Sequence, residues 1–133
     1  MVCIYCGKVT SVANSRHKIK TNEVWRRRAC QSCQAIFSTL ESVNLERSVS
    51  VKDIRGNLEP FERDKLYISI VSANGHRKDA SRAATALTAT VISQLLPKIN
   101  QALISKKQIV TVTSKVLSRF DKSASVTYAA YHA

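Results

Sequence analysis

The sequence predicts an α+β protein in two modules, a small antiparallel β-ribbon followed by a helical bundle with a small β-sheet. Three observations support this fold class. All four cysteines lie in two Cys-x-x-Cys pairs within the first quarter of the 133 residues. Long apolar runs are scarce before residues 44 to 50 and common after them. The later apolar residues recur at strand-like and then at helical intervals. We therefore expect one module at residues 1–45 and a second at residues 46–133.

The cysteine spacing predicts one structural zinc site, with the ligands Cys3, Cys6, Cys30 and Cys33. Two thiolates separated by two residues lie on one turn, and two facing turns supply the tetrahedral sulfur ligands that Zn²⁺ prefers. Disulfides are an alternative, but such short loops constrain the unfolded chain little and belong mainly to secreted proteins. A redox dithiol is the other alternative. Cys3 leaves no room for a signal peptide, and no apolar run reaches membrane-spanning length, so we expect a cytoplasmic protein without membrane contact.

The charge balance predicts a polyanionic partner. The chain has 21 Lys and Arg against 9 Asp and Glu, which gives a formal net charge of +12. Such an excess favours nucleic acid or nucleotide phosphates, although charge alone does not choose between them. Both predicted modules are basic, so the excess is not confined to one tail.

The segment between Cys6 and Cys30 predicts strands of a ribbon with a knuckle at each end. Gly7 follows Cys6 and tolerates the positive φ that such a knuckle needs. Gln34 holds the equivalent place after Cys33, so we expect a less regular second knuckle. Because 47 residues bury little surface, zinc binding is expected to contribute the folding free energy of this module.

The strand that leads into Cys30 predicts a nucleic-acid-binding surface. Its alternation places Arg26 and Arg28 on one face, with Trp25 and Arg27 on the other. The planar guanidinium suits phosphate oxygens and guanine edges, and a basic module built on a zinc site favours duplex DNA as the partner. A solvated charged strand is the alternative. The predicted DNA-binding residues are Arg16, Lys18, Arg26, Arg27 and Arg28.

The second module begins with a predicted strand at residues 48–52 and a turn at residues 55–57. Pro60 suits the first turn of a helix that extends to about Ala73, before Asn74 and Gly75. We expect its core residues to be Phe61, Leu66, Ile70 and Val71.

Three further helices follow in the predicted order. Ser81 is expected to cap the first, which ends near Pro97 and buries Ala84, Leu87, Val91 and Leu95. Ser105 opens a capping box, and Ile109, Val112, Val116 and Phe120 then recur at helical intervals. Residues 109–113 also have strand propensity, but we predict a helix there. The last predicted helix covers residues 122–131.

These motifs resemble the NrdR family of bacterial transcriptional repressors, in which a zinc ribbon precedes an ATP-cone. In the ribbon, the similarity covers both cysteine pairs, residues 14–16 and 26–29, and the segment from Phe37 to Glu41. In the cone, Gly56, Glu59-Pro60-Phe61 and Lys65-Leu66 follow the family pattern, and residues 121–129 resemble its last helix.

The resemblance implies a repressor of ribonucleotide reductase genes that binds double-stranded operator DNA through the ribbon. It also implies that ATP and dATP bind the cone and change the homo-oligomeric state. Carried over by position, Val51, Glu59 and Lys65 contact the nucleotide. The family's Lys-Arg pair is replaced by residues 53–55, so Lys52 and Arg55 are the candidates to substitute for it.

Two other functional classes remain for comparison. A zinc-ribbon interaction module with a degenerate cone would hold a protein partner without sensing nucleotide. An enzyme is disfavoured, because a four-thiolate zinc site is coordinatively closed and the three histidines are isolated in sequence. We therefore predict no catalytic residues.

Overall fold

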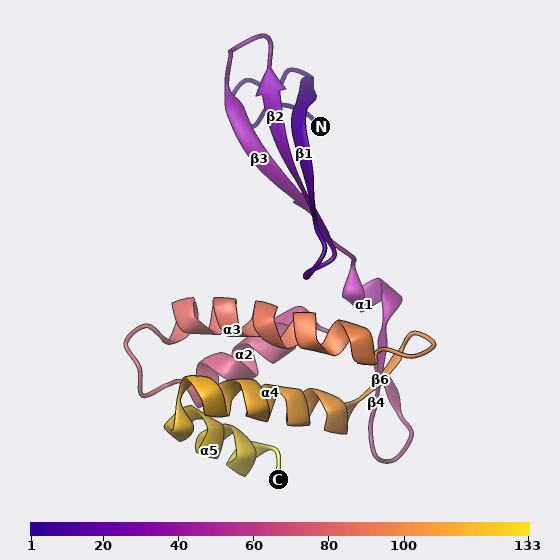
Figure 1. The fold of residues 1–133 in the computed structure, drawn as a ribbon, viewed down its shortest axis with the longest axis vertical. Coiled ribbons are helices and arrows are strands. Elements are labelled where there is room, and N and C mark those ends of the chain that lie inside the picture. The colour runs from indigo at the N-terminus through magenta and orange to yellow at the C-terminus, as the bar shows by residue number, and fades with distance from the viewer. The chain divides into compact units, whose positions relative to one another are not determined.

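The computed structural model describes residues 1–133, which form two compact units, Met1–Val43 and Asn44–Ala133. The division between them lies two residues before the predicted boundary. The first unit contains only strands and turns, whereas the second contains all the helices (Figure 1). The predicted α+β class is confirmed. No helix combines the length and the apolar character needed to cross a bilayer.

The first unit is a three-stranded antiparallel sheet in the order β1-β2-β3. Its strands are β1 (Thr10–Lys18), β2 (Glu23–Cys30) and β3 (Ile36–Glu41). Strand β2 pairs on both sides and keeps a regular register from Val24 to Ala29, whereas β1 has an irregularity between Val12 and Asn14. The irregularity therefore leaves the predicted alternation of the arginines on β2 intact.

Both cysteine knuckles place the residue after their second cysteine in the left-handed region. Gly7 has φ +72° and its amide donates to the Cys3 carbonyl oxygen at 2.9 Å. Gln34 has φ +62°, and its side-chain amide donates to the Gln31 carbonyl oxygen at 2.8 Å. The expectation of a less regular second knuckle is wrong in this respect, because a glutamine occupies the left-handed region that glycine occupies in the first.

The second unit has a small sheet in the order β5-β4-β6. It contains β4 (Ser50–Lys52), β5 (Leu58–Pro60) and β6 (Leu103–Ser105), with β5 antiparallel and β6 parallel to β4. The predicted strand at residues 48–52 is present but begins two residues later. Pro60 was assigned to a helix and instead ends β5 opposite Ser50. An edge strand accepts proline, because its outer amide needs no partner.

The helices of this unit are α1 (Leu45–Ser48), α2 (Arg63–Ala73), α3 (Ala80–Leu95), α4 (Lys106–Phe120) and α5 (Lys122–Tyr131), with a 3₁₀ turn at Leu96–Lys98. The Ser105 capping box is present, and the segment at residues 109–113 is helical as predicted. Ser81 is not a cap, since α3 already begins at Ala80 after Asp79. The Ser81 carbonyl oxygen instead accepts the Thr85 hydroxyl at 3.0 Å.

The hydrophobic core belongs to the second unit. It joins β4, β6 and Phe61 to α2, α3, α4 and α5. Ile70, Val91 and Leu117 at its centre have no exposed surface. Val71, which was expected in the core, is only half-buried. Of the apolar residues predicted at helical intervals in α4, Ile109 is half-buried, and Phe120 is exposed beneath the guanidinium of Arg77, whose Cζ lies 4.7 Å from the ring centroid.

Candidate functional site

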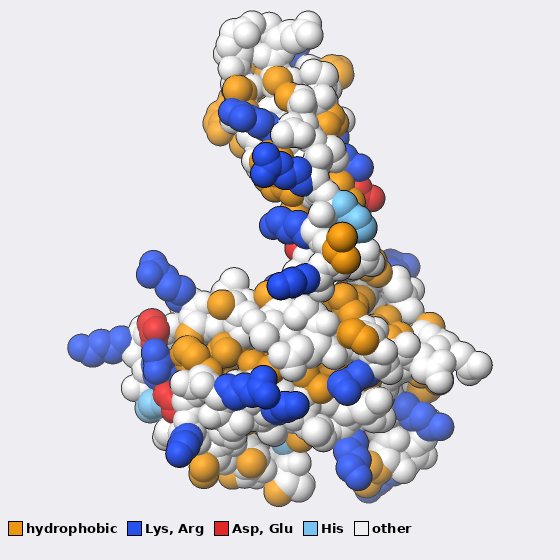
Figure 2. All heavy atoms as spheres, in the orientation of Figure 1, with side chains coloured by type: hydrophobic (Ala, Val, Ile, Leu, Met, Phe, Trp, Pro, Cys, Tyr) orange, Lys and Arg blue, Asp and Glu red, His pale blue; other side chains and the backbone are white.

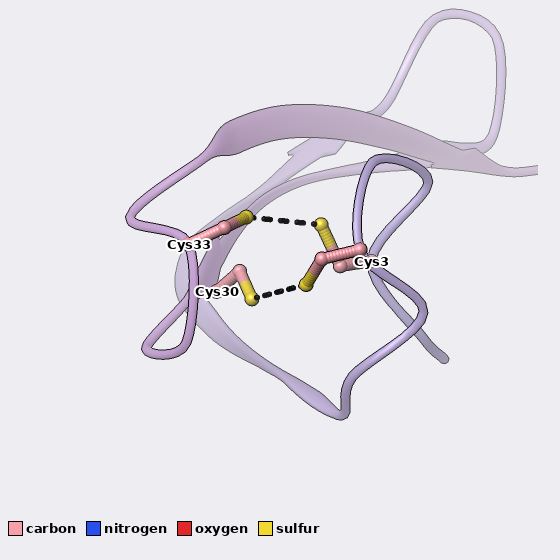
Figure 3. Close-up of side chains that lie close together, drawn as sticks. Cys3, Cys30 and Cys33 are labelled. Atoms are coloured by element: carbon pink, nitrogen blue, oxygen red, sulfur yellow. Dashed lines mark hydrogen bonds between the residues drawn. The ribbon is translucent and has the colours of Figure 1, made fainter.

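The four predicted ligands converge at one end of the ribbon. Their sulfur atoms all lie within 4.8 Å of one another. The Sγ–Sγ distance is 3.6 Å between Cys3 and Cys33, and 3.5 Å between Cys6 and Cys30 (Figure 3). A tetrahedron with Zn–S bonds of about 2.3 Å has edges of about 3.8 Å, so these thiols fit a zinc ion.

The local electrostatics also favour a bound cation. Hydrogen bonds from the Cys33 amide, the Cys6 thiol and the Ser32 amide lower the pKa of Cys30 to about 7, although burial acts to raise it. The Ala35 amide acts to lower the pKa of Cys33, but burial and the three neighbouring thiols raise it to about 12. Four thiolates this close repel one another, so full deprotonation requires a divalent cation.

The basic side chains of the ribbon divide between the two faces of its sheet. Directly paired residues share a face, and Arg16 pairs with Trp25, Lys18 with Glu23, and Arg27 with Asn14. We call this surface, made by Arg16, Lys18, Trp25 and Arg27, the Trp25 face. The alternation of β2 places Arg26 and Arg28 on the opposite surface. Figure 2 shows Lys and Arg side chains along the visible side of the ribbon.

The arginines on the two faces differ in the interactions that they already make within the ribbon. Arg26 forms an ion pair with Glu41. Arg28 is half-buried, and its guanidinium donates to the Thr10 hydroxyl at 3.5 Å, while its Nε is buried without a partner. On the Trp25 face, Arg27 is exposed and has no ion pair, and Arg16 lies over the Trp25 ring at 5.8 Å from its centroid. The Trp25 face therefore has the freer cations.

The second unit contains a cleft between β4, β5 and the helices α2, α4 and α5. Its empty space of about 550 Å³ includes the open solvent at its mouth. The wall is mainly apolar and includes Val51, Phe61, Ile109 and Tyr128. An apolar wall of this kind suits a flat aromatic ring.

Besides Tyr128, five titratable groups line this cleft, and two of them form an ion pair. The Lys65 Nζ lies 3.2 Å from each carboxylate oxygen of Glu59. The other three are Glu62, Lys106 and His132. His132 stacks on Tyr128 with a centroid distance of 4.2 Å. Burial, followed by the charge of Lys106, lowers the pKa of His132, so this imidazole stays neutral near pH 7.

Comparison with known proteins identifies the family. Residues 1–41 match the family described as the N-terminal domain of transcriptional repressor NrdR-like proteins. The transcriptional repressor NrdR of Chlamydia pneumoniae is 32% identical over 130 residues, which cover 97% of this chain and 84% of that protein. The chain belongs to the NrdR family. The NrdR of Chlamydia trachomatis serovar L2 is 31% identical, with 97% and 82% coverage.

Membership of the NrdR family makes the chain a transcriptional repressor with a zinc-ribbon domain, which is a non-enzymatic role. The expectation of a repressor of this family is confirmed. The four thiols are the candidate zinc site of that domain. Repression implies DNA as a partner, and the basic sheet is the candidate surface for it.

Only some of the residues predicted to bind nucleotide line the cleft. Val51, Glu59 and Lys65 line the cleft, whereas Lys52 and Arg55 do not. Val51 is buried and Lys52, the next residue of β4, is exposed, because successive strand residues face opposite sides.

The loop after β4 holds Arg55 away from the cleft. The Asp53 carboxylate accepts the Arg55 amide at 2.8 Å and the Asn57 amide at 2.9 Å, which closes a tight turn. Gly56 has φ +87° in this turn. The Asn57 side-chain amide also donates to this carboxylate, at 2.9 Å. That bond, followed by those from the backbone amides, lowers the pKa of Asp53. The substitution of Lys52 and Arg55 for the displaced basic pair therefore finds no support in this geometry.

Sequence reasoning missed the side of the cleft that α4 and α5 supply. Lys106, Tyr128 and His132 lie more than 40 residues after Lys65 in the chain, and no local motif connects them with it. The one available signal was the capping box at Ser105, which fixes Lys106 as the first residue of α4.

Proposed function

We propose that this chain represses ribonucleotide reductase genes by binding operator DNA through its zinc-loaded ribbon, under the control of ATP and dATP bound in the cleft. The proposal is supported by two features of one NrdR-family chain: a four-thiol centre at the end of a basic sheet, and a separate, largely apolar cleft lined by two lysines.

Zinc would be held by Cys3, Cys6, Cys30 and Cys33, and it would supply rigidity. With four sulfur ligands the ion has no open position for a reactive water. The two knuckles are 27 residues apart along the chain, at the start of the ribbon and at the end of β2, so a shared ion fixes the strand that bears the arginines.

We assign DNA binding to Arg16, Lys18, Arg26, Arg27 and Arg28, with the Trp25 face making the closer contact. Arg27 has no competing carboxylate, and the Trp25 ring limits the rotamers of Arg16. A guanidinium held in this way loses less side-chain entropy when it binds phosphate or a guanine edge. Arg26 would first have to leave Glu41.

We assign nucleotide binding to the cleft, with Val51, Glu59 and Lys65 as contacts. The apolar wall would take the adenine ring, and a lysine would take phosphate oxygens. ATP and dATP differ by one ribose hydroxyl, so a selective response requires a contact to the ribose. A nucleotide shifts an assembly equilibrium only when it binds one assembly more tightly than another.

Two solution measurements test this proposal together. The molecular mass of the zinc-loaded chain is measured without nucleotide, with ATP and with dATP, and binding to a promoter duplex of the host's ribonucleotide reductase genes is measured in the same three states. We expect the assembly and the DNA affinity to change between ATP and dATP. An unchanged mass and an unchanged affinity in all three states would overturn nucleotide control.

The second candidate function is a zinc-ribbon interaction module that no longer senses nucleotide. The observation that favours it is the exclusion of Lys52 and Arg55 from the cleft. Calorimetric titration with ATP and dATP separates the two functions, because the absence of binding by both ligands would leave only the interaction module.

A further inference from the structure

We infer that Lys106 is the phosphate-binding cation of the cleft. It would take the role that was expected of Lys52 and Arg55, which do not line the cleft. This inference rests on the proposed nucleotide function and identifies the residue that makes the cleft bind a polyanion. It concerns the first residue of α4, which no sequence pattern assigned to the site.

The charges that line the cleft single out Lys106. Two lysines and two glutamates face it, and His132 is neutral near pH 7. Lys65 is already bound to both carboxylate oxygens of Glu59. Lys106 forms no ion pair, so it is the cation available to an incoming phosphate. Without it the lining would carry a net negative charge and would repel a triphosphate.

The place of Lys106 in the cleft is supported by its neighbours. Its charge contributes to the lowered pKa of His132, which stacks on Tyr128 in the same wall. A phosphate bound by Lys106 would therefore lie beside a ring pair. This arrangement joins the apolar wall, which suits a base, to a cation that suits the phosphates.

The helix end that contains Lys106 is electrostatically unfavourable in the absence of a ligand. The first turn of α4 has Lys106 and Lys107 and no acidic residue. Cations at a helix N-terminus are repelled by the positive end of the macrodipole. An anion bound to Lys106 would reverse this local cost, because helix N-termini attract phosphate.

The test compares Lys106→Ala with Lys107→Ala. Both substitutions remove one positive charge from the same helix turn, but Lys107 does not line the cleft. Calorimetric affinities of the zinc-loaded chain are measured for adenosine, AMP and ATP. We expect Lys106→Ala to weaken ATP binding about tenfold or more, as the loss of a hydrogen bond to a charged group does. Adenosine binding should change less than twofold.

The control variants make each outcome decisive. Lys107→Ala should keep ATP binding within about twofold, and Lys106→Arg should retain most of it. Equal losses in Lys106→Ala and Lys107→Ala, or an equal loss for adenosine and ATP, would overturn the assignment. Thermal unfolding of both variants checks that α4 remains folded. If the wild-type chain binds none of the three ligands, the proposed nucleotide function fails, and the inference fails with it.

Discussion

The two units of this chain are held together by different forces. In residues 1–43 the only buried side chains are Cys3 and Cys30, each 2% exposed. In residues 44–133 a continuous apolar core joins the small sheet to four helices. A unit without a core cannot offset its conformational entropy by hydrophobic burial. We therefore expect the ribbon, unlike the helical unit, to depend on a metal ion for its folding.

The same difference determines which side chains each unit leaves available for binding. The only buried residues of the ribbon are two of the predicted metal ligands. Its other side chains are at least partly exposed, so the basic ones are accessible to DNA. The helical unit closes around a cleft whose lining includes charged groups.

Loss of zinc should unfold the ribbon and leave the helical unit folded. Chelation or Cys30→Ser removes an interaction that contributes about 10–16 kcal/mol in comparable zinc modules. Residue-resolved amide exchange should show protection lost in residues 1–43 and kept in residues 44–133. Ser32→Ala, between two ligands, is the matched control and should bind one zinc ion per chain. Equal loss of protection in both units would contradict the contrast.

Removal of a core side chain should destabilise only the helical unit. Ile70 is fully buried and Ile68, on the same helix α2, is 61% exposed. Ile70→Ala should lower the free energy of unfolding by about 2–5 kcal/mol through lost burial and a cavity. Ile68→Ala should change it by less than about 0.5 kcal/mol. Chemical denaturation followed by circular dichroism measures both, and unequal zinc content between the variants would show that the units are coupled.

The two faces of the ribbon should differ in their contribution to DNA binding. Arg27→Ala removes a free guanidinium of the Trp25 face and should cost about 1–3 kcal/mol of binding free energy. Arg26→Ala removes one already paired with Glu41 and should cost less. Fluorescence anisotropy at several salt concentrations measures both affinities and the salt slopes. A larger loss in Arg26→Ala would place the contact on the opposite face.

The smallest expected effect is a loss of stability in acid at the junction of α4 and α5. Hydrogen bonds from His76, the Ala124 amide and Arg77 lower the pKa of Asp121 from the usual 3.8 to about 2. A lowered folded-state pKa gives stability that is present above pH 4 and lost as the pH falls toward 2. Asp121→Asn should therefore destabilise the chain at pH 6, with a difference that shrinks in acid.

The control for this pH dependence is Asp64→Asn. Asp64 lies exposed in the first turn of α2 and forms no ion pair. Its substitution should leave the acid limb of the denaturation profile as in the wild type. A constant destabilisation by Asp121→Asn at every pH would show that the carboxylate acts through packing and not through its charge.

Much of the fold was predictable because local chemistry fixes it. The Cys-x-x-Cys spacing located the ribbon, and the capping box at Ser105 located the start of α4. Errors arose where tertiary pairing overrides local preference. Pro60 suits a helix start by sequence but is placed on an edge strand by β4, and β6 was missed because its three residues become a strand only beside β4.

Of the two candidate sites, the sequence predicted the metal site fully and the cleft only in part. The four ligands share two local motifs, so sequence spacing was enough to find them. The cleft collects residues from β4, β5, α2, α4 and α5, and only packing brings Lys106 and His132 near Lys65. Strand alternation explains why Lys52 is excluded while its neighbour Val51 is included.

The central claim is that a zinc-dependent ribbon binds DNA under the control of a nucleotide in the helical unit. The most direct test is an anisotropy titration of the promoter duplex with the zinc-loaded chain, in the absence of nucleotide, with ATP and with dATP. We predict affinities that differ between the two nucleotides and that vanish on chelation in all three states. Tight binding that neither chelation nor nucleotide alters would contradict the account.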